Sequence, residues 1–453
     1  MTYIVSMVFG IRLVKYINNE MSINENWQQR PMMICKLHMT DKKNKYQHMN
    51  KDRVAIIGTV GLPAKYGGFE TLAEHLVEHL SPKYDFTVFC SGNKYTKKER
   101  TSTYKGAVLK YIPLNANGIQ SIPYDTISIL LALKNSDVLL ILGVAGAWIL
   151  PFVRLFTNKK IIISIDGMEW KRDKWPLLAK LYLWWSEKIA IKFSHIDISD
   201  NESIQDYTAL RYKTLSRVIE YGADHTLQVK PCRKDIRKYR FLKRKYAVKV
   251  CRIEPENNVH SVLEAFKKYA KMNLVIVGNW NNSKYGIDLK ESYKDIQNIL
   301  LLDPIYNQRE IDLIRSNATL YIHGHSAGGT NPSLVEAMYL KLPVIAFNVS
   351  YNKTTTENNA LYFNSSEDLI DHLNTITESV LLEQRIKMKE IASRRYTWNV
   401  ISNQYDLLIK EALSIKLKNS VLGEIQKLNP TILQEYQLSH LQNSILFYEN
   451  KQL

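Results

Sequence analysis

The sequence predicts an α/β protein built from two doubly wound parallel sheets, each the centre of a separate domain. Short apolar runs alternate along the chain with stretches of helical periodicity, as in repeated strand–helix units. Glycine-rich loops follow two of these runs. A chain of 453 residues with 45% apolar content can fill two cores but is too long for one ordinary domain.

The first sheet is expected to begin at residues 53–58. The following helix carries its apolar side chains on one face, namely Phe69, Leu72, Ala73, Leu76, Val77 and Leu80. Further strands of this sheet are predicted at 86–89, 138–142, 160–165 and 197–198. The second sheet is predicted from strands at 247–251, 274–277, 299–302, 320–322 and 344–347. Ligands of such sheets bind at the carboxyl ends of the strands, where Gly58, Asp166, Arg252, Gly278 and Gly324 lie.

One uncharged segment, residues 138–153, has to be weighed as a membrane span. It is shorter than the about 20 residues that a helix needs to cross a bilayer. Gly143, Gly146 and Pro151 also divide it, so a buried strand followed by a helix is predicted instead. Cys35, Cys90, Cys232 and Cys251 are scattered, which favours neither a disulfide framework nor a thiolate metal site and indicates a cytoplasmic protein. No signal peptide is expected at residues 4–17, because Arg12 and Lys15 interrupt them.

Residues 324–338 have the features of an anion site at a strand–helix turn. Gly328 and Gly329 allow the backbone to approach a ligand, and Pro332 begins a helix whose first amides are expected to be free for a phosphate. Glu336, one turn later, could accept hydrogen bonds from ribose hydroxyls. A nucleotide-linked substrate follows from this pattern, and a tight turn without a ligand is the alternative.

A second glycine loop spans residues 58–68. Gly67 and Gly68 stand directly before a predicted helix, which is again a geometry that suits phosphate. The loop matches neither the dinucleotide-binding pattern nor a P-loop, and a purely structural turn is the alternative.

These two loops, together with residues 166–175, 252–258 and 396–398, resemble the rhamnosyltransferases of capsule and cell-wall polysaccharide synthesis within glycosyltransferase family 4. The resemblance covers residues 51 to 412. It implies a GT-B fold, in which two Rossmann-like domains face each other across a cleft. It further implies metal-independent, retaining transfer from a nucleotide sugar, with the donor on the C-terminal domain and the acceptor on the N-terminal domain. No cofactor is implied.

The resemblance assigns roles to individual residues. Arg252 would neutralise the leaving diphosphate, and Asp166 and Glu169 would position or deprotonate the acceptor hydroxyl. The alternative is that the leaving phosphate accepts the proton and that either acid is a helix cap or a partner for Arg172. The residues expected to bind the donor are Gly67, Gly68, Arg252, His325, Thr330, Asn331, Ser333 and Glu336. No metal is expected, because His323 and His325 lack a third ligand.

This chain departs from the family at two positions. Asn257 stands where most members have a lysine, so the second phosphate cation is unassigned, with Lys65 and Arg309 as candidates. Gly328 stands where most members have a second glutamate, a departure that the rhamnosyltransferase branch shares.

Basic residues are concentrated at 230–249. This run holds ten lysines and arginines against Asp235 alone, which is nine of the formal net charge of +17. A solvated linker and a surface for anionic lipid or a lipid diphosphate acceptor are both compatible with it. Nucleic acid is not expected as a partner, because no nucleic-acid-binding motif accompanies the run.

The domain limits follow from these patterns. Residues 1–50 are expected to be a basic extension, either disordered or upstream of a true start at Met49. The remainder divides into an acceptor domain (51–225), a basic linker (226–246), a nucleotide-sugar domain (247–395), a helix returning to the first domain (396–412) and a helical tail (413–453).

The predicted protein is a retaining glycosyltransferase that moves a hexosyl group, rhamnosyl by resemblance, from a nucleotide diphosphate sugar to a glycan or polyprenyl-diphosphate-linked acceptor. A nucleotide-sugar epimerase of the same fold and a non-catalytic binding protein with a vestigial cleft remain alternatives. Cytoplasmic localisation is expected, and peripheral contact with the inner face of the plasma membrane is left open.

Overall fold

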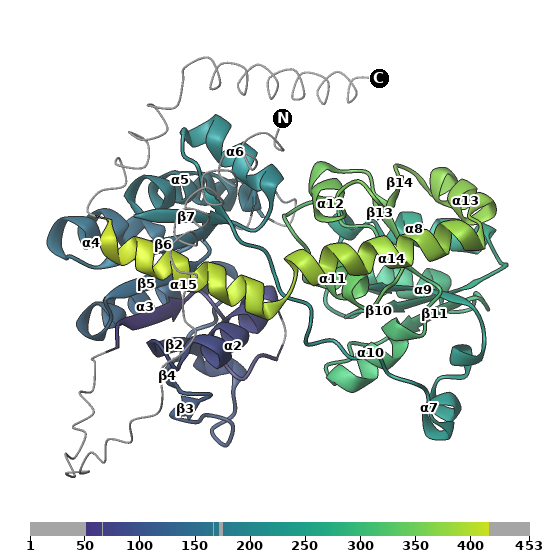
Figure 1. Ribbon diagram of the computed structural model, residues 1–453, viewed down its shortest axis with the longest axis horizontal. Coiled ribbons are helices and arrows are strands. Elements are labelled where there is room, and N and C mark those ends of the chain that lie inside the picture. The colour runs from purple at the N-terminus through teal and green to yellow at the C-terminus, as the bar shows by residue number, and fades with distance from the viewer. Residues whose placement is uncertain (1–50, 66, 166, 172–174, 416–453) are drawn as a thin grey trace, which may run out of the picture. The chain divides into compact units, whose positions relative to one another are not determined.

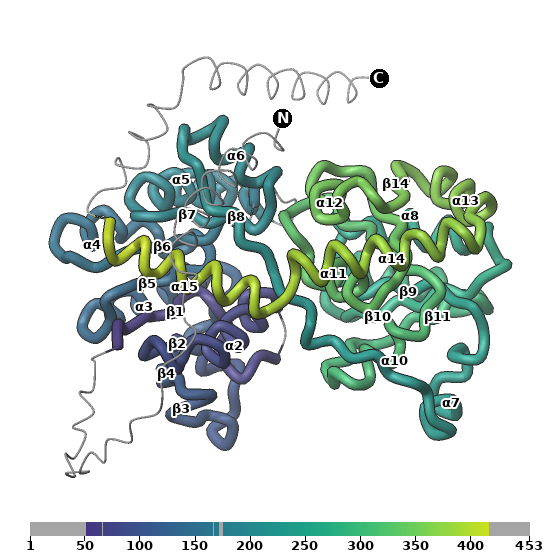
Figure 2. The backbone as a smooth tube through the Cα atoms, in the orientation of Figure 1, coloured from purple at the N-terminus to yellow at the C-terminus, as the bar shows by residue number. Residues whose placement is uncertain are grey.

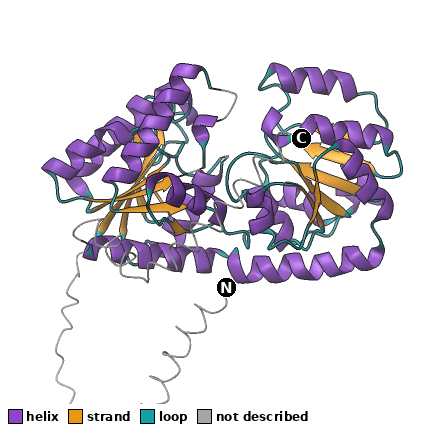
Figure 3. Cartoon of the chain, turned by 90° about the horizontal axis from the view of Figure 1, so that it is seen from above, coloured by secondary structure: helices purple, strands orange, loops and turns teal. Residues whose placement is uncertain are grey.

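The protein is described by a computed structural model that covers residues 51–65, 67–165, 167–171 and 175–415. The expected extension at 1–50, Asp166, Arg172 and the tail beyond residue 415 lie outside the described residues. The two predicted doubly wound sheets are present, and helices lie on both sides of the strands in each half (Figure 3).

The first half contains an eight-stranded sheet of order β3-β4-β2-β1-β5-β6-β7-β8 (Figure 1). Its pairs are parallel except for the antiparallel β3–β4 pair. The strands are β1 (Arg53–Ile57), β2 (Asp85–Ser91), β3 (Thr103–Tyr104), β4 (Ala107–Ile112), β5 (Val138–Leu142), β6 (Lys160–Ile165), β7 (Ile196–Ser199) and β8 (Arg217–Val218). The helices are α2 (Gly68–Leu80), α3 (Ser121–Asn135), α4 (Leu150–Phe156), α5 (Leu177–Phe193) and α6 (Glu202–Tyr212).

Alternate residues of the central strands face different helical layers. Val54 and Ile56 of β1 pack in the same core as α2, whereas Ala55 and Ile57 pack with α3, α4, α5 and α6. A strand covered on both faces has to be apolar throughout, which explains the continuous runs that identified β1, β5 and β6 from the sequence.

The second half contains a six-stranded parallel sheet of order β11-β10-β9-β12-β13-β14. Its strands are β9 (Tyr246–Val250), β10 (Asn273–Val277), β11 (Ile299–Leu302), β12 (Leu320–His323), β13 (Val344–Phe347) and β14 (Leu361–Phe363). Its helices are α7 (Arg233–Lys238), α8 (Val259–Lys268), α9 (Lys284–Tyr293), α10 (Gln308–Ser316), α11 (Pro332–Tyr339), α12 (Ser350–Thr355), α13 (Ser366–Thr375) and α14 (Glu378–Arg395). Short 3₁₀ helices include η3 (Ala147–Ile149), η4 (Glu169–Lys171) and η5 (Arg240–Lys243).

The last described helix joins the two halves. After α14, the chain continues into α15 (Trp398–Ser414), which packs against α2, β5 and β6 of the first half (Figure 2). Arg395, at the end of α14, forms ion pairs with Glu202 and Glu220 of the first half and with Glu357 of the second. One guanidinium therefore binds carboxylates from both halves.

The strand predictions are confirmed, with β5, β6, β11 and β13 matching the expected residues and the others differing by a few positions at their ends. The strands β3, β8 and β14 were not predicted, because two or three residues give little periodicity, and β4 was missed although its buried and exposed residues alternate. Residues 138–153 form β5, η3 and the start of α4, as expected. No helix in the part of the chain described here has the length and apolar character needed to cross a membrane.

The helical layer of the first half contains a buried acid, and its titration can be tested. Burial raises the pKa of Asp125, on α3, to about 8. The folded state favours the neutral form of Asp125, whereas the unfolded chain ionises it above about pH 4. The contribution of Asp125 to the free energy of unfolding is therefore complete below about pH 4. It is lost as the pH rises towards about 8, at up to about 1.4 kcal/mol per pH unit. Asp125→Asn, which stays neutral, should therefore gain stability over the wild type across this window.

Urea unfolding at several pH values from 5 to 9 measures this difference. Asp295→Asn, at an exposed position, serves as the control and should leave the pH dependence unchanged. If the curves of Asp125→Asn and the wild type run parallel, Asp125 is not the buried neutral acid inferred here.

Candidate active site

The glycine loop after β1 is held by two acids of α2. The Glu70 carboxylate accepts a hydrogen bond from the Val60 amide at 2.6 Å, and Glu74 accepts one from the Ala64 amide at 2.7 Å. Gly67 has φ of +125°, and a Cβ there would lie 1.9 Å from a Glu70 oxygen. Two side chains of α2 thus hold the loop that comes before this helix. The sequence did not reveal this role of Glu70 and Glu74.

The start of α11 is capped by its own side chains. Asn331 accepts a hydrogen bond from the Ser333 amide at 3.0 Å and from the Ser333 hydroxyl at 2.7 Å. The Leu334 and Val335 amides donate to the Asn331 carbonyl. The expectation that the first helical amides are free for a phosphate is therefore wrong, because the cap uses them.

Free donors lie slightly earlier in the same loop. Within the described residues, the main-chain amides of Gly328, Gly329 and Thr330 make no hydrogen bond. Consecutive free amides of this kind can surround an anion.

The loops of the two halves meet at these glycines. A Cβ on Gly68, at the start of α2, would lie 3.2 Å from the Pro332 side chain, at the start of α11. A Cβ on Gly329 would lie 1.8 Å from an oxygen of the buried Asp200, so any larger residue there would displace that side chain. Both predicted glycine loops therefore border the region where the start of α2 approaches the start of α11.

Asn201, which follows β7, connects the halves beside this place. Its amide nitrogen donates to the Thr330 hydroxyl at 3.1 Å and to the Thr355 hydroxyl at 3.2 Å. Thr330, predicted to bind the donor, thus has a protein partner already. Sequence reasoning missed Asp200 and Asn201, although their place at the carboxyl end of a strand was an available signal.

Glu336 is paired, and its side chain is only 13% exposed. One oxygen lies 2.5 Å from Nη2 of Arg315, and the other lies 3.2 Å from Nε2 of His225. Burial alone would raise the pKa of Glu336, but Arg315 and then His225 outweigh it and hold the pKa below its ordinary value. The carboxylate is therefore ionised and oriented. It retains lone pairs for further donors, since an ionised carboxylate has about four acceptor positions.

A short chain of aromatic contacts extends from Glu336 to the first half. The Trp398 indole, a donor only, donates to Nδ1 of His225 at 3.0 Å, so the proton of neutral His225 is on Nε2 and points to Glu336. His75 of α2 stacks on Trp398 with 4.1 Å between ring centroids. Burial and then the neighbouring His225 lower the pKa of His75 to about 4, which keeps it neutral at physiological pH.

Arg252 and His325 are connected through Asn257. The buried Asn257 side chain donates to the Arg252 carbonyl at 2.8 Å and accepts from Nδ1 of His325 at 2.6 Å. The residue at the family's lysine position thus fixes the loop geometry and supplies no charge. The Arg252 guanidinium is partly exposed and lies 3.8 Å from Glu254.

Neither predicted substitute for that lysine is free. Lys65 pairs with Glu99 at 2.8 Å, and Arg309 pairs with Asp235 at 3.0 Å. A different cation lies close to Gly324, at the start of the loop that precedes α11. Lys249, buried in β9, has Nζ only 2.8 Å from where a Cβ of Gly324 would be, and no carboxylate among the described residues pairs with it. Burial lowers the pKa of Lys249.

On the acceptor side, Glu169 accepts a hydrogen bond from the Trp175 indole at 3.0 Å. Asp166 lies outside the described residues, but its neighbour Gly167 approaches Gly328 closely. A Cβ on Gly167 would lie 3.4 Å from the Gly328 Cα. The loop after β6 therefore borders the same place, and the catalytic roles of both acids remain predictions.

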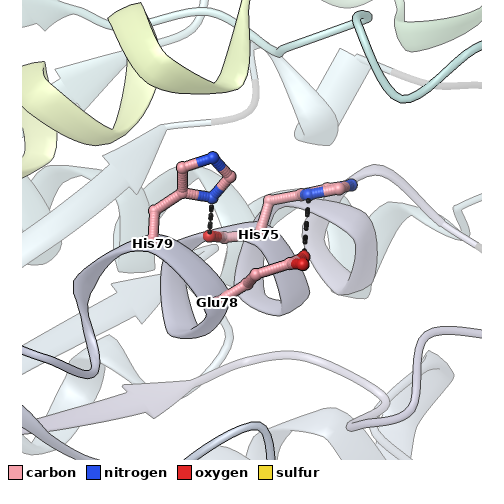
Figure 4. A group of neighbouring side chains, drawn as sticks. All are labelled: His75, Glu78 and His79. Carbon is pink, nitrogen blue, oxygen red and sulfur yellow. Dashed lines mark hydrogen bonds and ion pairs between the residues drawn. The ribbon is translucent and has the colours of Figure 1, made fainter.

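One group outside this site has the composition of a metal centre. His75, Glu78 and His79 lie on adjacent turns of α2 (Figure 4). However, Glu78 already binds the Lys105 ammonium at 2.9 Å, and Nδ1 of His79 donates to the His75 carbonyl. These contacts explain the cluster without an ion.

Several basic residues of the run at 230–249 form ion pairs within the protein. Lys238 pairs with Glu310, Lys245 pairs with Glu378 at 2.5 Å, and Asp235 binds Arg309. Lys249 is not part of a surface at all, contrary to its inclusion in the run, because it lies inside β9.

Two family models match this chain, one in each half. Residues 51–224 match the family model "Domain of unknown function (DUF1972)", and residues 233–395 match "Glycosyl transferases group 1". A search of curated protein sequences finds no match.

Several solved structures are similar over most of the chain. The sucrose-phosphate synthase of Thermosynechococcus elongatus has a TM-score of 0.68 at 14% identity, over 80% of this chain and 99% of that one. A glycosyltransferase from Rickettsia africae ESF-5 has a TM-score of 0.62 at 16% identity, over 81% and 99%. HepE of Anabaena in complex with UDP-glucose has a TM-score of 0.60 at 15% identity, over 79% and 99%. The chain therefore has the GT-B fold, and its second half matches the group 1 glycosyl transferases, which together support a glycosyltransferase.

Proposed function

We propose that the protein is a retaining glycosyltransferase that moves a hexosyl group from a nucleoside diphosphate sugar to a glycan or polyprenyl-diphosphate-linked acceptor. The observation that carries this proposal is the approach of Gly68 to Pro332, which brings both glycine loops to one place. One of these loops belongs to the region that matches group 1 glycosyl transferases.

The donor class is supported by a similar structure and by the charges of the site. HepE was solved with UDP and with UDP-glucose. In this chain, Arg252, the free amides at 328–330 and the paired Glu336 suit a diphosphate joined to a ribose. Rhamnose is proposed as the sugar from the resemblance in sequence, and family 4 membership is part of the same proposal.

The chemistry needs positive charge where the sugar–phosphate bond breaks. Negative charge develops on the leaving diphosphate, and preorganised donors there lower the barrier. Arg252 is proposed for this role. We assign the second charge to Lys249, whose Nζ lies beside Gly324. Burial alone disfavours its protonated form, and the negative charge of a bound diphosphate would favour that form. The acceptor proton passes to the leaving phosphate or to Asp166 or Glu169, which are proposed on the acceptor side.

A screen of nucleoside diphosphate sugars tests the proposal. A true donor should raise the melting temperature of the full-length protein and be hydrolysed slowly without acceptor. Conversion of the donor into a second sugar nucleotide would instead identify an epimerase. If no nucleotide sugar binds or reacts, the enzymatic proposal fails.

The first prediction from the proposed function concerns the residues expected to bind the donor. Glu336→Gln and Arg252→Gln should each lower transfer by roughly two to three orders of magnitude, or about 3 to 4 kcal/mol of transition-state stabilisation. Glutamine is preferable to alanine at 336, because truncation would leave Nη2 of the buried Arg315 without its 2.5 Å contact, with only Asp312 at 3.6 Å from Nη1.

Steady-state kinetics and calorimetry with UDP and dTDP measure these effects. Arg309→Gln, whose guanidinium pairs with Asp235 elsewhere, is the matched control and should retain activity. Unchanged turnover and nucleotide affinity in both site variants would reject the assignment.

The second prediction concerns metals. Because amides and cations are proposed to neutralise the diphosphate, transfer should be unaffected by EDTA. Activity is compared in EDTA and after addition of magnesium or manganese. Loss in EDTA with recovery on metal addition would mean that an ion carries this charge.

The third prediction concerns Lys249. Lys249→Met should weaken binding of nucleoside diphosphate about tenfold, since one charge-assisted contact contributes roughly 1.5 kcal/mol or more. The melting temperature should not fall, because replacing a buried unpaired ammonium with an apolar chain is often neutral or stabilising. If the folded variant binds nucleoside diphosphate as tightly as the wild type, Lys249 does not contact the diphosphate and its role is structural.

A further inference from the structure

The outer surface of the helical layer of the first half exposes large apolar side chains. Of the 22 large hydrophobic residues exposed among the described residues, 12 lie between residues 127 and 185. We call these the apolar face: Ile127, Leu130, Leu131, Trp148, Phe152, Leu155, Phe156, Leu177, Leu178, Leu181, Trp184 and Trp185. They come from α3, η3, α4 and α5, and the last three of these elements pack against one another.

The helix α5 shows why this face is unusual. Its buried side, which includes Ala190 and Ile191, packs against the sheet. Its opposite side carries Leu177, Leu178 and Leu181, of which the first two are 72% and 80% exposed. A helix that packs on one side against the core normally presents polar residues on the other. Exposed apolar patches of this kind mark a surface for a partner or a membrane.

The charges of the same helices are of one sign. Lys134 of α3 and Lys188 and Lys192 of α5 are exposed, and the two lysines of α5 follow Leu177 and Leu181 along the same side of that helix. The acids of α3, α4 and α5 are Asp125 and Glu187, and both are buried. The apolar face is therefore bordered by positive charge that no exposed acid of these helices offsets. A second copy of the chain would bring like charges together, whereas anionic lipid complements them.

The end of α4 adds a site suited to headgroups. A pocket of about 600 Å³ is lined by Arg154, Lys159 and Lys160 next to Leu155 and Phe156. The Arg154 guanidinium also contacts the His195 ring, and the Lys160 ammonium donates to the Ile415 carbonyl. Asp137 also lines it but is paired with Arg53 at 2.8 Å. Basic groups beside exposed apolar side chains are the combination found in segments that lie in a membrane interface. Trp148, Trp184 and Trp185 fit the same setting, since tryptophan is enriched at that depth.

We propose that the apolar face seats the first half of the protein on an anionic membrane surface. Its leucine and phenylalanine side chains enter the boundary of the acyl layer, and the exposed Lys134, Lys188 and Lys192 contact the phosphates. This replaces the basic run at 230–249 as the expected lipid contact, since several charges of that run are paired within the protein. The proposal does not depend on transferase activity.

Flotation of the full-length protein with vesicles tests this without any nucleotide sugar. Vesicles of phosphatidylcholine with 30% phosphatidylglycerol should carry the wild type, and vesicles of phosphatidylcholine alone should carry much less. The variant L177Q/L178Q/L181Q should bind the anionic vesicles at least about tenfold more weakly, because each leucine loses apolar burial.

Two matched variants isolate the effect. I287Q/L382Q/I386Q changes three exposed apolar residues of the second half and should float like the wild type. R240Q/K243Q/R244Q/K245Q changes the basic run and should also float like the wild type. Circular dichroism and melting temperature establish that each variant is folded.

Five results would overturn the proposal, the last of them a dimer in place of membrane binding. The first three are equal flotation of the α5 variant and the wild type, loss of flotation only in the basic-run variant, and loss only on deletion of residues 1–48. The fourth is flotation that requires deletion of residues 416–453, which would mean that this segment covers the face in the intact chain. A dimer that the α5 variant alone dissociates, without any flotation, would assign the face to a second copy.

Discussion

The buried carboxylate of Glu336 imposes the constraint on which the candidate site depends. An ion removed from water has to be paired, and its partners must come close with good geometry. Arg315 supplies the charge, and His225 supplies a hydrogen bond from the segment that connects the two sheets. Trp398 fixes the tautomer of His225 and begins α15, which packs on the first half. The orientation of one acid thus depends on the connecting segment and on the returning helix.

The same junction explains how distant loops come to one place. Arg395 binds Glu202, Glu220 and Glu357, and Asn201 binds Thr330 and Thr355. Burial raises the pKa of Glu220 to about 7 despite the opposing effect of Arg395, so this contact is not a simple exposed ion pair. Hydrogen bonds between the halves therefore lie directly beside the glycine loops, and the position of any ligand there is set by residues of both halves.

Charge and apolar surface are distributed differently from what composition suggests. The basic run at 230–249 dominates the net charge, yet its lysines and arginines partly pair with α10 and α14. The apolar face has a smaller charge, but its acids are buried and its positive groups stand beside exposed leucine and tryptophan. Affinity for a surface depends on unpaired charge and exposed apolar area, and neither is visible in a count of residues.

The two doubly wound sheets are predictable from the sequence, because strands buried on both faces require continuous apolar runs such as 160–165 and 299–302. The sequence also located the glycine loops before α2 and α11, since a close backbone approach excludes a side chain. Only the tertiary structure decided the partners of Glu336, the buried position of Lys249 and the use of the Asn331 cap. Local periodicity carries no information about which distant side chain supplies a counter-charge. For the same reason it could not distinguish a helix with one covered side, such as α5, from a helix buried in the core.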